Sequence, residues 1–143
     1  WRMAPNLGAA LETADLRQHP TLVWDKGRLG MGAIFRNQHE FIVHFSVGTP
    51  SPPQRRDVPN VVTCKPVRSQ DHPTEKPSAL LQTLLSVVAA PASVILDPFA
   101  GSGSTIYAAL ALGHSAIAVE ADERYCEVIA KRLSQGAFDL TGL

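Results

Sequence analysis

The fold is decided by one stretch of sequence, Asp97-Pro98-Phe99-Ala100-Gly101-Ser102-Gly103-Ser104-Thr105. An apolar run at Ser93–Leu96 precedes it and is typical of a buried strand. A small-residue helix is expected to follow at Thr105–Leu112, with Gly113 as its C-terminal stop. Ser115–Val119 is the next predicted strand. A strand that turns into a helix through glycines is a place where open α/β sheets bind ligands.

The flanking segments extend this pattern in both directions. Pro77 suits the first position of a helix, and apolar residues recur at helical spacing from Leu80 to Val88. A last helix is expected from Asp122 to about Leu133. Helix, strand, helix, strand and helix in this order predict parallel strands joined by right-handed crossovers, which is a doubly wound α/β architecture.

The first half of the chain predicts shorter elements. A helix is expected at Leu7–Leu16. Strands at Thr21–Trp24 and His39–Phe45 are expected to pair as an antiparallel hairpin around a glycine-containing loop. Val61–Cys64 is a weaker strand candidate.

Prolines divide the chain. Seven of the eleven prolines lie between Pro50 and Pro77, so this segment is expected to be irregular. We therefore predict a single domain with three parts: a hairpin half at 1–49, a proline-rich connector at 50–76 and a ligand-binding half at 77–143.

Length and charge set further limits. The 143 residues suffice for one domain, and a hydrophobic content of 45 % excludes a wholly disordered chain. No apolar run reaches the ~18 residues of a membrane span, so we expect a soluble protein, and two distant cysteines favour a reducing cytoplasm. The net charge of zero combines nine basic and six acidic residues in 1–71 with four and seven in 72–143. This asymmetry favours an anionic partner for the first half, although chance also accounts for it.

The glycine-rich turn and the strand that follows it suggest a binding pocket. Gly101 and Gly103 let a ligand approach the backbone without a Cβ in the way. Glu120, at the end of the next strand, can accept hydrogen bonds from a ribose diol. The alternative is that the glycines form only a tight connection and that Glu120 only caps the last helix.

The residues of the turn also discriminate between nucleotide ligands. A phosphate loop needs a lysine where Ser104 stands, and a dinucleotide fingerprint needs a third glycine where Ile106 stands. Asp97 would repel a pyrophosphate but suits the ammonium and sulfonium groups of S-adenosylmethionine (SAM). A nucleotide-binding α/β oxidoreductase remains an alternative.

These segments resemble a known family. Asp97–Thr105 resembles the SAM-binding motif of DNA amino-methyltransferases, which modify N6 of adenine or N4 of cytosine, and His72–Pro77 resembles their second cofactor motif. The motif order is that of the β-group, and the resemblance covers about residues 20–135. It implies part of a Rossmann-like methyltransferase fold with a terminal antiparallel hairpin. It also implies SAM as cofactor, double-stranded DNA as partner and a cytoplasmic protein of bacterial or phage origin.

The resemblance implies individual roles as well. Lys76 and the backbone near Thr74 would hold the methionine end of SAM, and Asp97 would face its amino group. Glu120 would bind the ribose hydroxyls, and Asp122 would approach the adenine. The expected cofactor-binding residues are Thr74, Lys76, Asp97, Pro98, Phe99, Ala100, Gly101, Ser102, Gly103, Ser104, Glu120 and Asp122.

The family's catalytic motif, Asp/Asn/Ser-Pro-Pro-Tyr/Phe, has no good match in this sequence. The only Pro-Pro, in Ser51–Gln54, lacks the aromatic residue that stacks on a flipped base, and it follows both hairpin strands. We therefore expect no catalytic residue and no metal site in this chain. We also expect the chain, whose first residue is Trp1, to be the C-terminal portion of a longer enzyme. An exposed strand edge would then invite self-association, or pairing with a chain that supplies the missing central strands.

Cations gather in the loops of the first half. We expect contacts with DNA phosphates from the loop and the connector, through Lys26, Arg28, Arg36, Arg55 and Arg56. A solvated basic surface is the alternative for these side chains. A DNA-binding or regulatory module without catalytic activity is the alternative for the whole chain.

Overall fold

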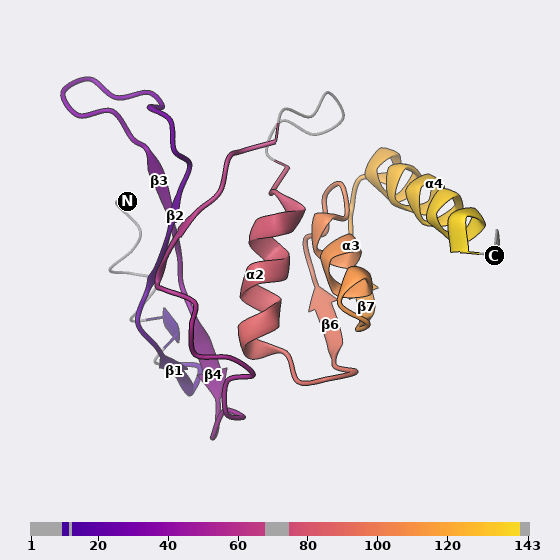
Figure 1. Cartoon of the computed structure of the whole chain (residues 1–143), viewed down its shortest axis with the longest axis horizontal. Helices are drawn as coiled ribbons and strands as arrows, with labels where there is room; N and C mark the ends of the chain where they lie inside the picture. Colours follow the sequence, from indigo (N-terminus) through magenta and orange to yellow (C-terminus); the bar gives the residue numbers. More distant parts are fainter. Residues whose placement is uncertain (1–9, 12, 68–74, 141–143) are drawn as a thin grey trace. The chain divides into compact units, whose positions relative to one another are not determined.

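The computed structural model describes residues 10–11, 13–67 and 75–140 (Figure 1). The chain divides into two compact units, unit 1 at Trp1–Lys65 and unit 2 at Pro66–Leu143. The described strands form three separate sheets, of two, three and two strands.

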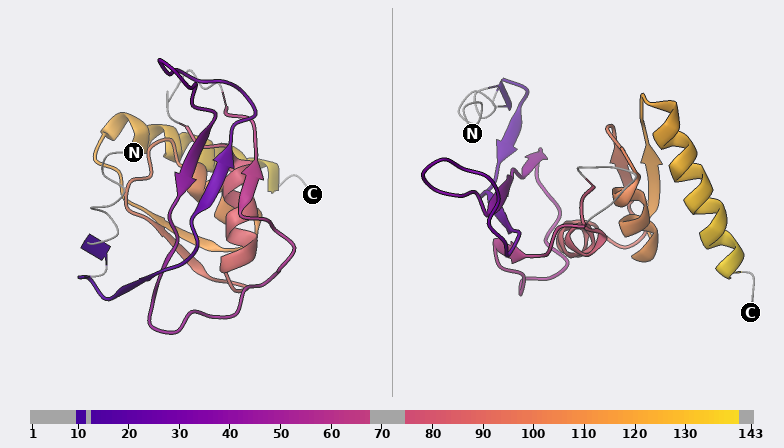
Figure 2. Two further views of the ribbon diagram at one scale, coloured as in Figure 1. Left: turned by 90° about the vertical axis from the view of Figure 1, so that its left-hand side faces the viewer. Right: turned by 90° about the horizontal axis from the view of Figure 1, so that it is seen from above.

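Unit 1 is built from short strands. β2 (Leu22–Asp25) pairs antiparallel with β3 (His39–Ile42), which confirms the predicted hairpin. β5 (Val61–Thr63) pairs parallel with β2 on its other side, so the weaker strand candidate is also confirmed. β1 (Leu16–Gln18) and β4 (Phe45–Val47) form a separate antiparallel pair. The left view of Figure 2 shows β3, β2 and β5 side by side.

Two elements of unit 1 differ in extent from the prediction. The helix expected at Leu7–Leu16 does not reach Leu16, which begins β1 after a turn in which Asp15 has a φ of 55°. The single strand expected at His39–Phe45 is two strands, because the chain pairs first with β2 and then with β1. At the corner between them, the backbone N–H of His19 donates to the carbonyl of His44 at 2.9 Å.

Trp24 is the buried centre of unit 1. Its side chain is 3 % exposed, and its indole N–H donates to the carbonyl of Cys64 at 2.7 Å. The ammonium of Lys26 lies 5.1 Å from the centroid of the indole ring, which is within cation–π range. The indole therefore ties the segment after β5 to β2.

Unit 2 follows the predicted order of elements. These are α2 (Ser78–Val88), β6 (Val94–Asp97), α3 (Ser104–Ala111), β7 (Ser115–Ala118) and α4 (Glu123–Leu140). β6 and β7 are parallel and are connected through α3, as predicted. Both α2 and the sheet pack against α3.

The core of unit 2 lies between α3, α4 and one face of the sheet. Ala100, Ile106 and Ile129 form a buried cluster against which Ala116 of β7 packs. Ala108 and Ala109 of α3 are fully buried. Small side chains at these positions allow the close approach of neighbouring elements. This packing fixes the turn between β6 and α3.

The ends of two helices differ slightly from the prediction. Pro77 has extended backbone angles, φ −60° and ψ 129°, so it is the N-cap and Ser78 is the first helical residue of α2. The last helix begins at Glu123 because Asp122 acts as its N-cap, with Oδ1 accepting from the backbone N–H of Arg124 at 3.0 Å. It extends to Leu140, beyond the expected end near Leu133.

The other face of the β6–β7 sheet is apolar and exposed. Leu96 and Ile117 are register partners, and their exposed fractions are 62 % and 55 %. Val94 and Val119 continue the same face and are 62 % and 54 % exposed. We call these four residues the open sheet face.

Candidate cofactor-binding site

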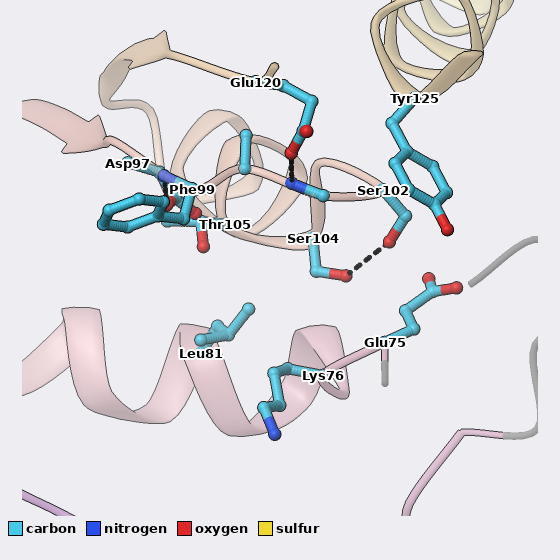
Figure 3. Close-up of a pocket in the computed structure, with 12 residues that line it drawn as sticks. Glu75, Lys76, Leu81, Asp97, Phe99, Ser102, Ser104, Thr105, Glu120 and Tyr125 are labelled. Atoms are coloured by element: carbon cyan, nitrogen blue, oxygen red, sulfur yellow. Dashed lines mark hydrogen bonds between the residues drawn. The ribbon is translucent and has the colours of Figure 1, made fainter. Parts of the chain in front are cut away.

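A cavity of about 300 Å³ lies at the carboxyl end of β6, within unit 2 (Figure 3). This is the end of a parallel sheet at which α/β proteins bind ligands. Its walls come from the segment before α2, from α2, from the glycine-rich turn and from the residues around the start of α4. The lining residues are Glu75, Lys76, Leu81, Asp97, Phe99, Ala100, Gly101, Ser102, Ser104, Thr105, Glu120 and Tyr125.

The glycine-rich turn is held in shape by short local contacts. Asp97 accepts a hydrogen bond at Oδ1 from the backbone N–H of Phe99 at 3.0 Å, which starts the turn. Gly103 has a φ of 83°, a left-handed conformation that favours glycine. A Cβ at Gly103 would lie 2.8 Å from Cγ1 of Ile129, so the packing of α4 also excludes a side chain there. The turn is therefore rigidly placed against α4.

Glu120 links this turn to the start of α4. Its Oε2 accepts from the backbone N–H of Gly101 at 2.7 Å, and its Oε1 accepts from the backbone N–H of Asp122 at 2.9 Å. One carboxylate thus bridges two backbone segments that lie on opposite sides of β7 in the sequence. Each oxygen keeps a second lone pair for a ligand.

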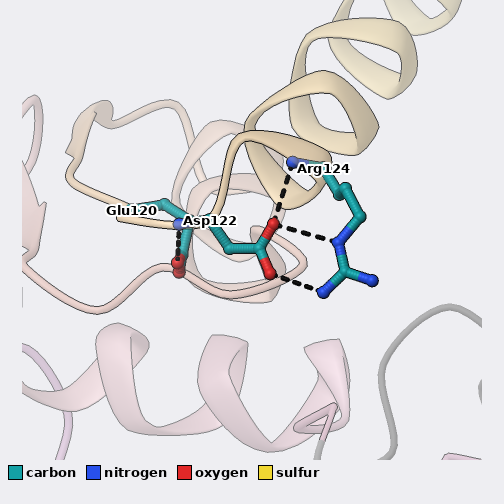
Figure 4. A network of polar contacts seen from close by, with 3 residues as sticks. All are labelled: Glu120, Asp122 and Arg124. Carbon is teal, nitrogen blue, oxygen red and sulfur yellow. Dashed lines mark hydrogen bonds and ion pairs between the residues drawn. The ribbon is translucent and has the colours of Figure 1, made fainter.

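Asp122 continues the same network (Figure 4). Its Oδ1 accepts from Nε of Arg124 at 3.1 Å, and its Oδ2 accepts from Nη2 at 2.6 Å. The carboxylate therefore faces a guanidinium as well as the backbone at the start of α4. Asp122 lies beside the cavity and is not part of its wall.

These contacts shift the acidity of both carboxyls. Backbone hydrogen bonds, first from Asp122 and then from Gly101, lower the pKa of Glu120. The side-chain hydrogen bond from Arg124 is the main cause that lowers the pKa of Asp122. Both groups are therefore carboxylates at neutral pH, and they place negative charge at this end of the pocket.

Arg132 of α4 joins the two remaining walls. Its Nη1 lies 3.5 Å from Oε1 of Glu75 and 3.5 Å from the carbonyl oxygen of Ser102. Its guanidinium carbon lies 5.9 Å from the ring centroid of Tyr107. Oε2 of Glu75 is buried and has no hydrogen-bond partner among the described residues. Arg132 therefore connects the segment before α2 to the glycine-rich turn.

The structure brings most of the predicted cofactor-binding residues together. Those on the cavity wall are Lys76, Asp97, Phe99, Ala100, Gly101, Ser102, Ser104 and Glu120. Pro98, Gly103 and Asp122 support the turn and the start of α4 without lining the cavity. Thr74 lies outside the described residues.

Four wall residues were not predicted as ligands. Glu75 adjoins Lys76 in the segment before α2, and Leu81 is one of the apolar residues at helical spacing in α2. Thr105 is the last residue of the motif, directly after the predicted ligand Ser104, and Tyr125 stands in the first turn of α4. The sequence signal for Thr105 was its place within the motif, and the signal for Tyr125 was its nearness to Glu120 in the sequence.

Comparison with known proteins identifies the family. A family model described as "DNA methylase" matches residues 8–132. The chain belongs to the DNA methylase family. The resemblance to DNA amino-methyltransferases is therefore confirmed.

Individual relatives and solved structures show how far the similarity extends. "Putative methylase YubD" of Escherichia coli K12 is 35 % identical over 134 residues, which is 94 % of this chain and 59 % of YubD. The chain thus spans less than two thirds of that relative. The crystal structure of the M1.HpyAVI–SAM complex matches with a TM-score of 0.76 and 25 % identity, and the match covers 92 % of this chain and 70 % of the other.

The fold prediction is confirmed by these neighbours. A third similar structure, PvuII DNA methyltransferase (cytosine-N4-specific), has a TM-score of 0.77 at 16 % identity, and the match covers 88 % of this chain and 54 % of that one. At that identity it shows the fold alone. The chain has the α/β, Rossmann-like fold of SAM-dependent methyltransferases. SAM, the predicted cofactor, is the ligand of the M1.HpyAVI complex.

The cations predicted to contact DNA lie in unit 1 and differ in their surroundings. Lys26 forms an ion pair with Glu40 at the base of the β2–β3 loop. Arg55 forms a two-pronged pair with Asp57, at 2.7 and 2.6 Å, which lowers the pKa of Asp57 to about 2. Arg28, Arg36 and Arg56 are exposed and have no acidic partner among the described residues.

The Pro-Pro segment belongs to unit 1 and none of its residues lines the cavity. Residues 51–54 form an exposed loop of unit 1, in which the amide of Gln54 donates to the carbonyl of Pro52 at 3.3 Å. Across the described part of the chain, no helix combines the length and apolar character needed to span a bilayer.

Proposed function

We propose that this chain is the SAM-binding and DNA-facing portion of a methyltransferase. The enzyme would transfer a methyl group from SAM to an exocyclic amine of DNA, N6 of adenine or N4 of cytosine. The observation that carries the proposal is the bridge from Glu120 to Gly101. It places a carboxylate and a glycine turn on one cavity at the carboxyl end of β6.

The cavity lining supports SAM in preference to a phosphate-bearing nucleotide. Asp97, Glu120 and Glu75 contribute carboxylates, and Lys76 is the one basic residue among the lining residues described. Carboxylates repel a pyrophosphate, but they attract an ammonium group and accept hydrogen bonds from hydroxyls. Bound SAM would supply an activated methyl group on a sulfonium.

Three side chains of the lining then have distinct roles. Oδ1 of Asp97 holds the turn, and its other oxygen is available to the ligand ammonium. Glu120 keeps one lone pair on each oxygen for the ribose hydroxyls while it holds Gly101 and Asp122. The ammonium of Lys76 suits the carboxylate at the methionine end.

Calorimetry tests the cofactor proposal. The chain is titrated with SAM, with its demethylated product S-adenosylhomocysteine, and with NAD. We expect heat from the first two ligands and none from NAD. Preferential binding of NAD would overturn the proposal and favour a nucleotide-binding oxidoreductase. Transfer of a radiolabelled methyl group to DNA by this chain would contradict the expectation that it lacks the catalytic motif.

The proposed DNA contacts rest on the cations of unit 1. Of the five cations predicted to contact DNA, Arg28, Arg36 and Arg56 lack acidic partners among the residues described, so phosphates can reach them without competition from a carboxylate. Phosphate contacts are independent of sequence and depend on salt. Gel-shift titration with a mixed-sequence duplex at rising salt tests them. Unchanged affinity after Arg28→Ala, Arg36→Ala and Arg56→Ala together would exclude these contacts.

A second copy of the chain is proposed to cover the open sheet face. Leu96 and Ile117 expose more than half of their side chains, and β6 pairs only with β7 among the described strands. An unpaired strand edge and an exposed apolar sheet face each favour association with another chain. Sedimentation over a range of concentrations tests this. Leu96→Asp is expected to shift the chain to monomer, and a wild-type monomer at high concentration would contradict the proposal.

A further inference from the structure

The loop between β2 and β3 exposes an unusual cluster of apolar side chains. Met31, Ile34 and Phe35 are 89 %, 88 % and 88 % exposed. No acidic residue stands between Gly27 and Gln38, and two arginines, Arg28 and Arg36, flank the three apolar residues. Exposed apolar groups gathered in this way mark interaction sites. We call Met31, Ile34 and Phe35 the loop tip.

The base of the loop is closed by hydrogen bonds. The backbone N–H of Lys26 donates to the carbonyl of Gln38 at 2.9 Å. Oδ1 of Asp25 accepts from the backbone N–H of Gly27 and from the side-chain amide of Gln38, both at 2.9 Å. The loop therefore leaves the β2–β3 pair as a defined projection, visible beyond the strands in Figure 1.

The upper part of the loop is also closed and tightly packed on its inner side. The backbone N–H of Gly30 donates to the carbonyl of Asn37 at 2.6 Å, and Nε of Arg36 donates to the carbonyl of Gly30 at 2.8 Å. A Cβ at Gly32 would lie 2.0 Å from the carbonyl oxygen of Phe35. The backbone at Gly32 therefore lies close to the backbone at Phe35, and the side chains of the loop tip are exposed to solvent.

An apolar tip between two arginines fits one occupant on a DNA methylase. Proteins that distort duplex DNA insert apolar side chains between base steps while neighbouring cations hold the phosphates. We infer that the loop tip is a wedge that enters the base stack of double-stranded DNA, with Arg28 and Arg36 on the flanking phosphates. This inference rests on the proposed function, because it requires DNA as the partner.

The wedge is tested with a serine variant of the tip. The triple variant Met31→Ser, Ile34→Ser, Phe35→Ser removes the apolar groups, and Val47→Ser is the matched control because Val47 is 75 % exposed in unit 1 outside the loop. Affinity for a mixed-sequence duplex is measured by anisotropy. Unstacking is measured by permanganate oxidation of thymines, which attacks bases that have left the stack. Circular dichroism and thermal melting of each variant establish that it is folded.

The expected results separate the wedge from the phosphate contacts. The wild type and Val47→Ser should raise thymine reactivity, and the triple variant should lose that signal with about tenfold weaker binding, the scale of one lost aromatic–base contact. The double variant Arg28→Ala, Arg36→Ala should instead reduce the slope of the logarithm of the binding constant against the logarithm of the salt concentration by about two.

The contrary results are equally distinct. Full affinity and full thymine reactivity in the triple variant would overturn the wedge and leave the DNA-facing proposal standing. No binding of DNA by the wild type would overturn both. Binding to anionic phosphatidylglycerol vesicles that depends on the tip, with unchanged DNA binding, would assign the tip to a membrane surface and overturn the wedge.

Discussion

The carboxylate of Glu120 accepts the backbone N–H of Gly101 at 2.7 Å, across 19 positions of the sequence. This hydrogen bond joins the glycine-rich turn before α3 to the segment after β7, and both residues line the cavity. A residue proposed to bind ligand therefore also shapes the turn that lines the site. Two readouts, ligand affinity and stability, are needed to distinguish these roles.

We expect Glu120→Gln to weaken SAM binding by at least about tenfold, because an amide cannot accept at both atoms and loses the charge-assisted bonds. Calorimetry measures the affinity. Glu123→Gln is the matched control, because Glu123 is exposed in the first turn of α4 and does not line the cavity. Equal SAM affinity of Glu120→Gln and the wild type would refute the ribose assignment.

The stability of unit 2 should fall in acid. Because the folded-state pKa of Glu120 is lowered below its ordinary value of 4.5, the stabilisation is fully present above that value. It is lost as the pH falls through the lower folded-state pKa. Thermal melting by circular dichroism between neutral pH and pH about 2 measures the loss. In Glu120→Gln the melting temperature should fall less steeply with pH below pH 4.5. An equally steep fall would rule out this carboxylate as a source of the acid sensitivity.

Gly103→Ala should destabilise unit 2 by more than Gly113→Ala. Both glycines have a positive φ, 83° and 75°, so both substitutions incur the left-handed cost of about 1–2 kcal/mol. Only at Gly103 does the new Cβ meet Ile129, at 2.8 Å, whereas nothing lies within 4 Å at Gly113. Urea denaturation gives both free energies of unfolding. Equal losses would show that α4 moves away without cost.

Arg132→Gln should destabilise unit 2 by about 1–2 kcal/mol, because it leaves the carboxylate of Glu75 uncompensated in a site where it is 14 % exposed. Glu75→Gln combined with Arg132→Gln should recover part of that loss, because no charge then remains unpaired. A double-mutant cycle from urea denaturation measures the coupling. Strict additivity would mean that the 3.5 Å pair contributes nothing.

The sequence predicted unit 2 well because its signals are local. Glycines, the leucine spacing of α2 and two short apolar runs each identify an element without knowledge of its neighbours. The position of Glu120 relative to Gly101 also followed from the sequence. Its bonds to two backbone N–H groups did not, although the alternative of Glu120 as a helix cap anticipated the contact with Asp122.

Unit 1 was harder to predict because its strands depend on distant partners. β1 and β4 have three residues each, too few for a periodic pattern, and they pair with each other across the corner at His19 and His44. The loop tip illustrates another limit. The sequence shows glycines and apolar residues there, but only the structure shows that the Phe35 side chain is exposed instead of packed.

The burial of Trp24 has a spectroscopic consequence. The sequence contains two tryptophans, Trp1 and Trp24, and both belong to unit 1, whereas unit 2 contains Tyr107 and Tyr125. Indole emission therefore reports the unfolding of unit 1, while helical ellipticity comes mainly from α2, α3 and α4 of unit 2. Each unit thus carries its own built-in optical probe. A ligand in the cavity should raise the midpoint temperature of the unfolding transition seen by ellipticity. The midpoint seen by indole emission will rise with it only if the two units unfold together.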